Sequence, residues 1–210
     1  MPNDPAPADA IPGAVPTRTG SRRPGERRLQ ILQTLAEMLE HPKAERITTA
    51  ALARKLDVSE AALYRHFASK AQMFEGLIEF IEQSVFGLIN QITSGEENGV
   101  KQARRMVAML LEFAQTNRGM TRVLIGDALV IEDERLQGRM NQLMDRLEAS
   151  LKQCLKVAVA QGDYPSEEDP AVRASLIMAY IIGRWSRFAK TGFRKSPLEY
   201  SESQALLLLS

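Results

Sequence analysis

The sequence is poor in the residues that build catalytic and metal sites. Its 210 residues include one cysteine, Cys154, and two histidines, so an internal disulfide cannot form and no His or Cys pair has metal-ligand spacing. There is no glycine-rich loop of the kind that cradles phosphate. Acidic runs at 132–134 and 167–169 fit helix starts, where carboxylates interact favourably with the helix dipole. We therefore expect no enzyme, no metal and no cofactor.

Long hydrophobic runs are also missing. The longest, residues 176–183, is well short of the roughly 18 residues that cross a bilayer. No apolar stretch follows the first residues as it would in a secretory leader. With 44% apolar and 25% charged residues, the composition is that of a globular protein. These features predict a protein of the reducing cytoplasm with no membrane partner.

Proline and positive charge are unevenly distributed. Six of the ten prolines lie in residues 1–24, which show no apolar period and end in a run of arginines. We interpret this stretch as a disordered basic arm, which either follows DNA phosphates or remains a solvated tail. Residues 18–70 carry 11 lysines and arginines against 6 acidic residues, whereas residues 71–210 carry 16 against 18. Such a segment is typical of a DNA-binding module on a neutral body, and is also common on a solvated surface.

Apolar residues three and four apart predict an all-α chain. From Glu26 onward, leucines at 29, 32, 35 and 39 follow the period of an amphipathic helix that ends near His41. Further helices are expected over residues 49–56, 59–66, 69–93, 98–116, 119–129, 132–161, 167–190 and 197–209. No stretch shows strand alternation between turn signals. We expect a three-helix DNA-binding domain over 25–70 and a helical dimerisation and partner-binding domain over 71–210.

Residues 47–70 carry the most informative pattern. Thr48 or Thr49, Ser59 and Ser69 are each placed to cap a helix, because a hydroxyl oxygen accepts from a free first-turn N–H. Apolar residues on the inner faces, with a small residue at the crossing, let two short helices pack closely. The pattern predicts a DNA-binding helix-turn-helix.

The second helix of this motif presents a polar side at its N-terminal end, which faces base edges. Glu60 could accept from a cytosine amino group, and Ala61 could meet a thymine methyl. Tyr64, His66 and Lys70 suit phosphate oxygens, although Tyr64 as packing and His66 as an ordinary surface residue remain open. The predicted DNA-binding residues are Arg46, Thr48, Thr49, Ser59, Glu60, Ala61, Tyr64, Arg65, His66 and Lys70.

The stretch 47–70 resembles the DNA-binding domain of tetracycline-repressor-type regulators. Their recurrent pattern is a helix begun by threonine, a turn ending Val-Ser, then Leu-Tyr-x-His-Phe and Ser-Lys, and all of these parts are present. The chain departs from it at Asp57, where the family usually has glycine, and at Ala68, where it usually has proline. Aspartate tolerates left-handed backbone, though less readily than glycine. The resemblance implies a dimer on palindromic double-stranded DNA.

Residues 77–82 and 135–143, outside the common DNA-binding domain, resemble the nucleoid occlusion branch of this family. The resemblance implies a DNA-activated inhibitor of cell division, which stays with the nucleoid and antagonises polymers of the tubulin-like protein FtsZ. It would bind the C-terminal tail of FtsZ along the helix after the DNA-binding domain. The expected contacts are Ile78, Glu79 and the anchor Phe80, with Arg104 and Arg105 as pairs for acidic tail residues. Core packing is the competing interpretation of the same apolar stripe.

The helix expected over 167–190 is apolar on more than one face. Such a helix needs more than one partner to cover it, and the apolar last helix lies close in sequence. Two helices from each protomer would form a four-helix interface, unless both faces pack inside the protomer. The predicted dimer contacts are Leu176, Ile177, Tyr180, Ile181 and the anchor Trp185.

Two functions are therefore open. One is the DNA-activated division inhibitor, and the alternative is a ligand-responsive repressor of the tetracycline-repressor type. The repressor should leave its operator when a small molecule binds, whereas the inhibitor should bind polymerised FtsZ more effectively when DNA is present.

Overall fold

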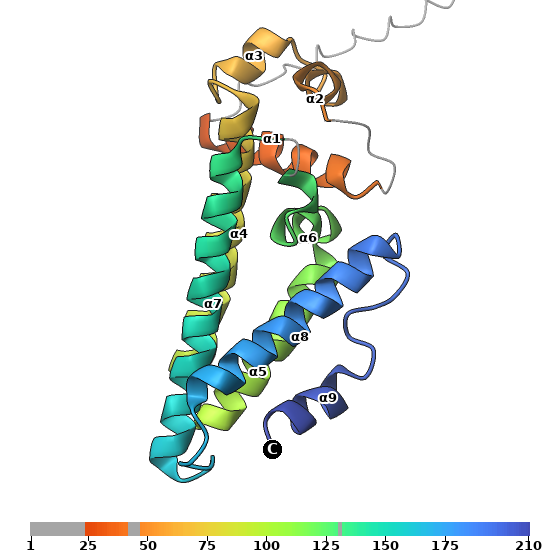
Figure 1. Cartoon of the computed structure of the whole chain (residues 1–210). Helices are drawn as coiled ribbons and strands as arrows, with labels where there is room; N and C mark the ends of the chain where they lie inside the picture. Colours follow the sequence, from red (N-terminus) through yellow and green to blue (C-terminus); the bar gives the residue numbers. More distant parts are fainter. Residues whose placement is uncertain (1–23, 42–46, 130–131) are drawn as a thin grey trace, which may run out of the picture.

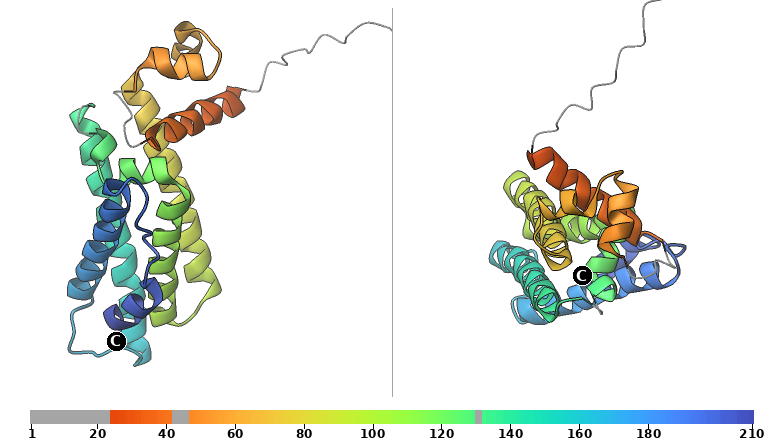
Figure 2. Two further views of the ribbon diagram at one scale, coloured as in Figure 1. Left: turned by 90° about the vertical axis from the view of Figure 1, so that its right-hand side faces the viewer. Right: turned by 90° about the horizontal axis from the view of Figure 1, so that it is seen from above.

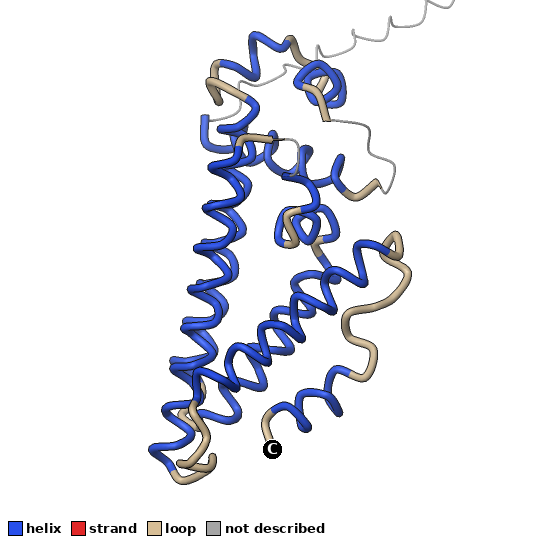
Figure 3. The backbone as a smooth tube through the Cα atoms, viewed as in Figure 1, coloured by secondary structure: helices blue, strands red, loops and turns tan. Residues whose placement is uncertain are grey.

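The computed structural model describes residues 24–41, 47–129 and 132–210, and within these ranges it contains helices and loops but no strand (Figure 3). The helices are α1 (Pro24–Leu39), α2 (Thr49–Lys55), α3 (Glu60–Tyr64), α4 (Lys70–Gly95), α5 (Gly99–Thr116), α6 (Arg118–Leu124), the short 3-10 helix η1 (Asp127–Leu129), α7 (Glu134–Gln161), α8 (Pro170–Lys190) and α9 (Ser201–Leu208). The all-α prediction is confirmed. Apart from Pro24, the proposed arm lies outside the described residues.

Side-chain caps begin the helices of the DNA-binding motif. Thr48, Ser59 and Ser69 each accept a hydrogen bond from a first-turn N–H, at the starts of α2, α3 and α4 respectively. In the turn between α2 and α3, Asp57 has a φ of 53°, the left-handed conformation that glycine adopts at least cost. The short motif is thus divided into helices by local hydrogen bonds.

The long helix α4 joins two parts of the molecule. Helices α1 to α3 form a head at one end, and α4 continues from the head along the body for 26 residues without a break (Figure 1). In the body α4 lies beside α7, and α5, α7 and α8 pack against one another (Figures 1 and 2). Helix α9 lies against α5 and α8. The arrangement places the helix-turn-helix at the end of a helical stem.

Trp185 of α8 anchors the core of the body. Its side chain is fully buried, and its indole Nε1 donates to the carbonyl oxygen of Leu110 in α5 over 3.1 Å. Ile181 and Ile177, one and two turns earlier on the same face, are also fully buried. Because an aromatic side chain of this size buries 150–250 Å², this face fastens α8 to its own protomer.

The head is joined to the body where α6 crosses α1. A Cβ atom on Gly119 would lie 1.8 Å from the carbonyl oxygen of Ala36, so the two backbones approach more closely than any other residue would allow. Arg122 Nη1 donates to the carbonyl oxygens of Leu39 and His41 at the end of α1, over 3.3 and 3.2 Å. The position of α1 is therefore set by α6.

Candidate DNA-binding and partner-binding surfaces

Helix α3 presents its N-terminal end and one side to solvent. Ala61 and Arg65 are exposed, and Tyr64 retains 45% of its accessible surface. Leu63 is buried beneath them. The face predicted from the sequence to point outward is the face that the fold leaves exposed.

A chain of hydrogen bonds links α2 to α3 across this face. The hydroxyl of Thr49 donates to a carboxylate oxygen of Glu60 over 2.6 Å, and the hydroxyl of Tyr64 donates to Thr49 Oγ1 over 3.5 Å. The predicted base contact Glu60 is thus oriented by Thr49 before DNA arrives. Thr48 is the residue that caps α2, so Thr49 is not the cap. The bond from Thr49 to Glu60 could not be predicted from the capping pattern.

Some predicted DNA contacts have structural roles. The hydroxyl oxygens of Thr48 and Ser59 accept from Ala51 N and Ala62 N, which leaves their hydroxyl hydrogens to reach a phosphate. Arg46 lies outside the part of the chain that the structure describes.

The end of the helix-turn-helix, at His66 and Phe67, is held by α1. Arg28 Nη1 donates to the carbonyl oxygen of His66 over 2.6 Å, and its guanidinium carbon lies 4.2 Å from the centroid of the Phe67 ring. His66 is half-buried. From the sequence, Arg27 and Arg28 at the start of α1 were expected either to follow DNA phosphates or to remain solvated. In the structure, Arg28 holds the end of the helix-turn-helix.

Lys70, predicted to bind phosphate, is already paired. Its Nζ lies 2.5 Å from a carboxylate oxygen of Glu132, at the start of the segment leading into α7. The side chains of Lys70 and Glu132 retain 22% and 10% of their accessible surface. Nothing in the local sequence signals this pair, since the two residues are 62 positions apart.

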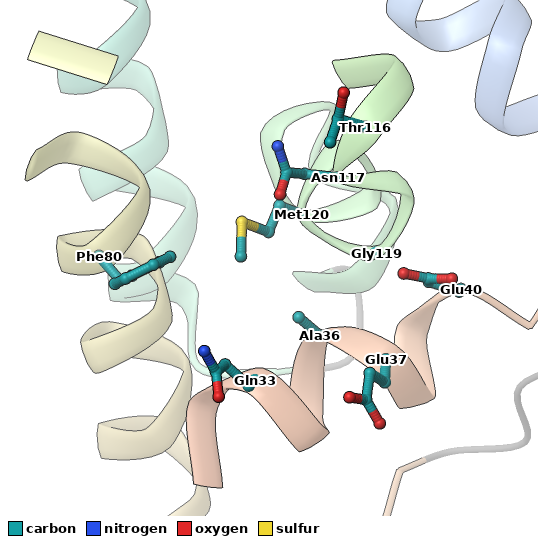
Figure 4. Close-up of a pocket in the computed structure, with 9 residues that line it drawn as sticks. All are labelled: Gln33, Ala36, Glu37, Glu40, Phe80, Thr116, Asn117, Gly119 and Met120. Carbon is teal, nitrogen blue, oxygen red and sulfur yellow. The ribbon is translucent and has the colours of Figure 1, made fainter. Parts of the chain in front are cut away.

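Phe80 lies in an open cleft between head and body. It is half-buried, and it faces α1 and the junction of α5 and α6 across a space of about 440 Å³ (Figure 4). The lining residues are Gln33, Ala36, Glu37, Glu40, Phe80, Thr116, Asn117, Gly119 and Met120. We call this space the head–body cleft. Of the partner contacts predicted from the sequence, Phe80 is the one the structure places there.

The structure corrects the prediction for Ile78. Its side chain is fully buried, because α4 is covered by α5 on one side and by α7 on another, so Ile78 cannot contact a partner. Glu79 is exposed, and it accepts a hydrogen bond from Gln83 Nε2 over 3.3 Å.

Arg104 and Arg105 do not join Phe80 in one site, contrary to prediction. They line a second hollow of about 350 Å³ between α5 and α9, and Arg105 Nη2 lies 3.2 Å from Glu96. Twelve residues of α5 separate Arg104 from Thr116 of the head–body cleft, which is about 18 Å along the helix axis. The charged residues that line the cleft are instead Glu37 and Glu40 of α1, which sequence spacing gave no reason to place near Phe80.

The predicted dimer contacts divide between core and surface. Ile177, Ile181 and Trp185 belong to the protomer core described above, so their assignment to a dimer interface was wrong. Leu176 retains 51% of its accessible surface on the opposite face of α8. Tyr180 is half-buried, and its hydroxyl donates to Gln204 of α9 over 2.9 Å.

Both α8 and α9 leave apolar side chains exposed. Exposed apolar side chains on the two helices are Val172, Leu176, Ala179, Ile182, Leu206 and Leu207. We call this set the α8–α9 face. A Cβ atom on Gly183, at the edge of this face, would meet no atom within 4 Å, so the protomer itself does not require glycine there. The face is suited to a close helix–helix contact with another molecule.

The residues that the structure describes offer little else for chemistry. Among them no group of three or more His, Cys, Asp or Glu side chains could hold a metal ion. None of the helices described combines the length and apolar character needed to span a bilayer. Burial raises the pKa of the single thiol, Cys154, so it is protonated at neutral pH.

Two family models match the chain. The model described as bacterial regulatory proteins of the tetR family matches residues 31–77, which include the helix-turn-helix. A SlmA-like model described as the tetracyclin repressor-like C-terminal domain matches residues 97–210, more than half of the chain.

Curated relatives are similar over most of their length. The nucleoid occlusion factor SlmA of Idiomarina loihiensis is 47% identical over 85% of this chain and 91% of its own. That of Marinomonas sp. strain MWYL1 is 47% identical over 90% of this chain and 95% of its own.

Solved structures share the fold at low sequence identity. A TetR transcription regulator from Haloarcula marismortui has a TM-score of 0.76 at 15% identity, covering 88% of this chain and 97% of its own. The fatty acid degradation regulator FadR from Bacillus halodurans has a TM-score of 0.75 at 14% identity, covering 90% and 97%.

Proposed function

Because this chain belongs to the SlmA family of nucleoid occlusion factors, within the TetR-type DNA-binding proteins, we propose that it inhibits FtsZ assembly over the nucleoid while bound to specific chromosomal sites as a dimer. The family consists of DNA-binding proteins, not enzymes. The head binds DNA, and the α8–α9 face joins two protomers. Two heads related by a twofold axis would bind the two halves of a palindrome.

The head–body cleft carries the part of the proposal that concerns FtsZ. It is open, it contains a large half-buried aromatic ring, and it lies between the DNA-binding head and the body. Such a site suits an extended peptide that inserts one apolar side chain as an anchor. We assign Phe80 as the contact for that anchor in the C-terminal tail of FtsZ.

The charge of the cleft wall indicates which kind of tail residue would lie against it. Of the lining residues described, those with charge are Glu37 and Glu40, and Glu37 also pairs with Lys55 over 3.1 Å. Basic residues of the tail, rather than acidic ones, would therefore lie against α1. Arg104 and Arg105 line a separate hollow, about 18 Å along α5 from the cleft.

Phe80→Ala tests this function. If Phe80 anchors the tail, the variant should keep its operator affinity and dimeric state while tail affinity falls about 30-fold or more, as for a hot-spot contact worth ~2 kcal/mol. Tail-peptide titration, operator titration and melting temperature are measured on the same sample. The variant should also fail to disrupt FtsZ polymers.

Phe86→Ala is the matched control. Phe86 is also a half-buried phenylalanine of α4, but it lies outside the cleft, beneath the guanidinium of Arg146, 4.0 Å from the ring centroid. The control should lose stability without losing tail affinity. If Phe80→Ala instead costs ~3 to 5 kcal/mol of folding stability and leaves tail affinity per folded molecule unchanged, Phe80 is a core residue and the proposal fails.

A further inference from the structure

The Lys70–Glu132 ion pair joins the first residue of α4 to the segment that enters α7. Its Nζ–Oε1 distance is 2.5 Å, and Nζ also lies 5.7 Å from the centroid of the Phe74 ring. Charged pairs with this little exposure are screened weakly by solvent. The pair therefore constrains the head relative to the body more than a surface salt bridge would.

Lys70 is also well placed to bind DNA. It is the first residue of a 26-residue helix, directly after the N-cap Ser69 and three residues beyond Phe67. The free N–H groups and dipole of a helix N-terminus attract phosphate, and a lysine there adds a full charge. With its Nζ held against Glu132 and Phe74, however, Lys70 must turn away from both to reach the DNA backbone.

We propose that Glu132 and DNA phosphate compete for Lys70, and that this competition couples DNA binding to the head–body cleft. In the free protein Glu132 holds Lys70, and on DNA the phosphate takes it. Glu132 is a positioning residue in this scheme, since it acts on DNA only through Lys70. The coupling half of the inference rests on the proposed function, whereas the competition for Lys70 does not.

Contacts among the described residues connect Glu132 to the cleft. The backbone N–H of Glu132 donates to the carbonyl oxygen of Leu129 in η1 over 3.0 Å, and η1 packs against α6. In α6, Gly119 and Met120 line the cleft opposite Phe80, and Gly119 lies against the α1 backbone (Figure 4). Releasing Glu132 from Lys70 thus removes one of the attachments that fix α6 against the head. The proposed coupling requires that the width of the cleft depend on that attachment.

Thermodynamic linkage makes the coupling reciprocal. If DNA raises the affinity for the FtsZ tail by some factor, the tail raises the affinity for DNA by the same factor. A variant that lacks the Lys70–Glu132 pair should resemble the DNA-bound state even when DNA is absent. It should bind DNA more tightly. DNA should also raise its affinity for the FtsZ tail by less than in the wild type.

Glu132→Gln tests the competition, and Glu134→Gln is its matched control. Glu134 is exposed in the first turn of α7, two positions away, and its change removes the same charge from the same region. Affinities are measured for a duplex selected by the protein from random sequence and for an unrelated duplex, at several salt concentrations. Melting temperatures confirm that both variants fold.

We expect Glu132→Gln to tighten both duplexes on the order of fivefold, the lower end of typical coupling between sites, and Glu134→Gln to do so far less. In a Lys70→Ala background, Glu132→Gln should have no further effect on DNA affinity. Unchanged or weakened DNA binding by Glu132→Gln, or an equal gain from Glu134→Gln, would overturn the competition.

A second measurement tests the coupling. A synthetic peptide of the FtsZ C-terminal tail is titrated into wild type and Glu132→Gln, each with and without the selected duplex. DNA should raise tail affinity in wild type and raise it by less than twofold in the variant, within the noise of independent sites. If the variant responds to DNA as wild type does, the coupling is wrong while the proposed function stands. If wild type does not bind the peptide under either condition, the proposed function fails, and the DNA titrations still decide the competition.

Discussion

At the scale of single residues, the DNA-facing surface is ordered by its own hydrogen bonds. The carboxylate of Glu60 is held by Thr49, and Tyr64 donates to the same threonine. A side chain that is already oriented loses less conformational entropy on binding, so its base preference is sharper. We therefore expect the specificity of this surface to depend on Thr49, which need not touch a base itself.

Thr49→Val should change sequence preference more than overall affinity. Valine keeps the shape of threonine but cannot donate to Glu60, so the carboxylate is freed to adopt other rotamers. Affinities for the selected duplex and for its single-base variants should lie closer together, by about 1 kcal/mol at the position that Glu60 contacts.

Thr48→Ala is the neighbouring control. It removes the N-cap of α2, which typically costs ~1 kcal/mol of stability, and should weaken every duplex by a similar factor. The assignment of Thr49 fails if Thr49→Val shifts all duplexes equally.

Residue roles were predictable from sequence where the cause is local. The caps Thr48, Ser59 and Ser69 act within three residues, so their hydrogen bonds are encoded in short patterns. The partner of Lys70 is 62 positions away, and its identity depends on how α7 returns to the head. Ile78 was misplaced because helical period does not reveal that α4 is covered on two sides.

At the scale of elements, the crossing of α6 over α1 fixes the head. Gly119 allows the two backbones into contact, and Arg122 caps the end of α1 while pairing with Asp127 over 2.6 Å. The joint thus combines a close backbone approach with hydrogen bonds to carbonyl groups at the end of α1, where a helix leaves its last carbonyls without intrahelical partners.

Gly119→Ala should loosen this joint. The added Cβ would lie 1.8 Å from the Ala36 carbonyl oxygen, which is backbone and cannot move aside without displacing α1. We expect a lower melting temperature and weaker operator binding, with destabilisation of ~1 to 3 kcal/mol as for overpacked sites.

Gly87→Ala provides the comparison. Gly87 is an exposed glycine within α4 whose added Cβ would meet nothing within 4 Å, so alanine there should raise stability by roughly 0.5 to 1 kcal/mol. Equal effects of the two substitutions in thermal unfolding would show that the α1–α6 contact is not tight.

The helices themselves were largely predictable, because their apolar period and caps agree. Among the differences, the helix expected over 119–129 divides into α6 and η1. Gly126 adopts a φ of 77° between them, a left-handed conformation that ends an α-helix. An isolated glycine in a helical pattern does not announce whether it interrupts the helix.

At the scale of the whole molecule, the two apolar faces of α8 differ in exposure. One face, with Trp185, is buried in the protomer core, and the other, with Leu176, is exposed and is the proposed contact with a second protomer. The sequence correctly predicted that this helix has two apolar faces. It did not indicate which face is buried in the protomer, because periodicity gives the spacing of apolar residues and not the direction in which they point. The choice is made by α5 and α7, which cover one side of α8.

Leu176→Asp should produce folded monomers with poor operator affinity. The aspartate would be solvated in the protomer but buried without a partner in the dimer, which disfavours association. A monomer loses the gain from binding two half-sites at a fixed separation. Sedimentation, circular dichroism and operator titration measure the three properties.

Ile181→Asp should behave differently. It places a charge in the protomer core, and should cost on the order of 4 kcal/mol or more of folding stability. A well-folded Ile181→Asp monomer, or a Leu176→Asp dimer, would contradict the assignment of the two faces.

The unbroken length of α4 also makes the position of the head sensitive to small tilts of this helix. Its 26 residues span about 39 Å, with helix α3 of the DNA-binding motif at one end and the body at the other. A tilt of roughly 5° about the far end moves the head by about 3.4 Å, the rise of one base pair. A tighter joint between α1 and α6 allows the head less tilt. It therefore narrows the range of half-site spacings that a dimer can span.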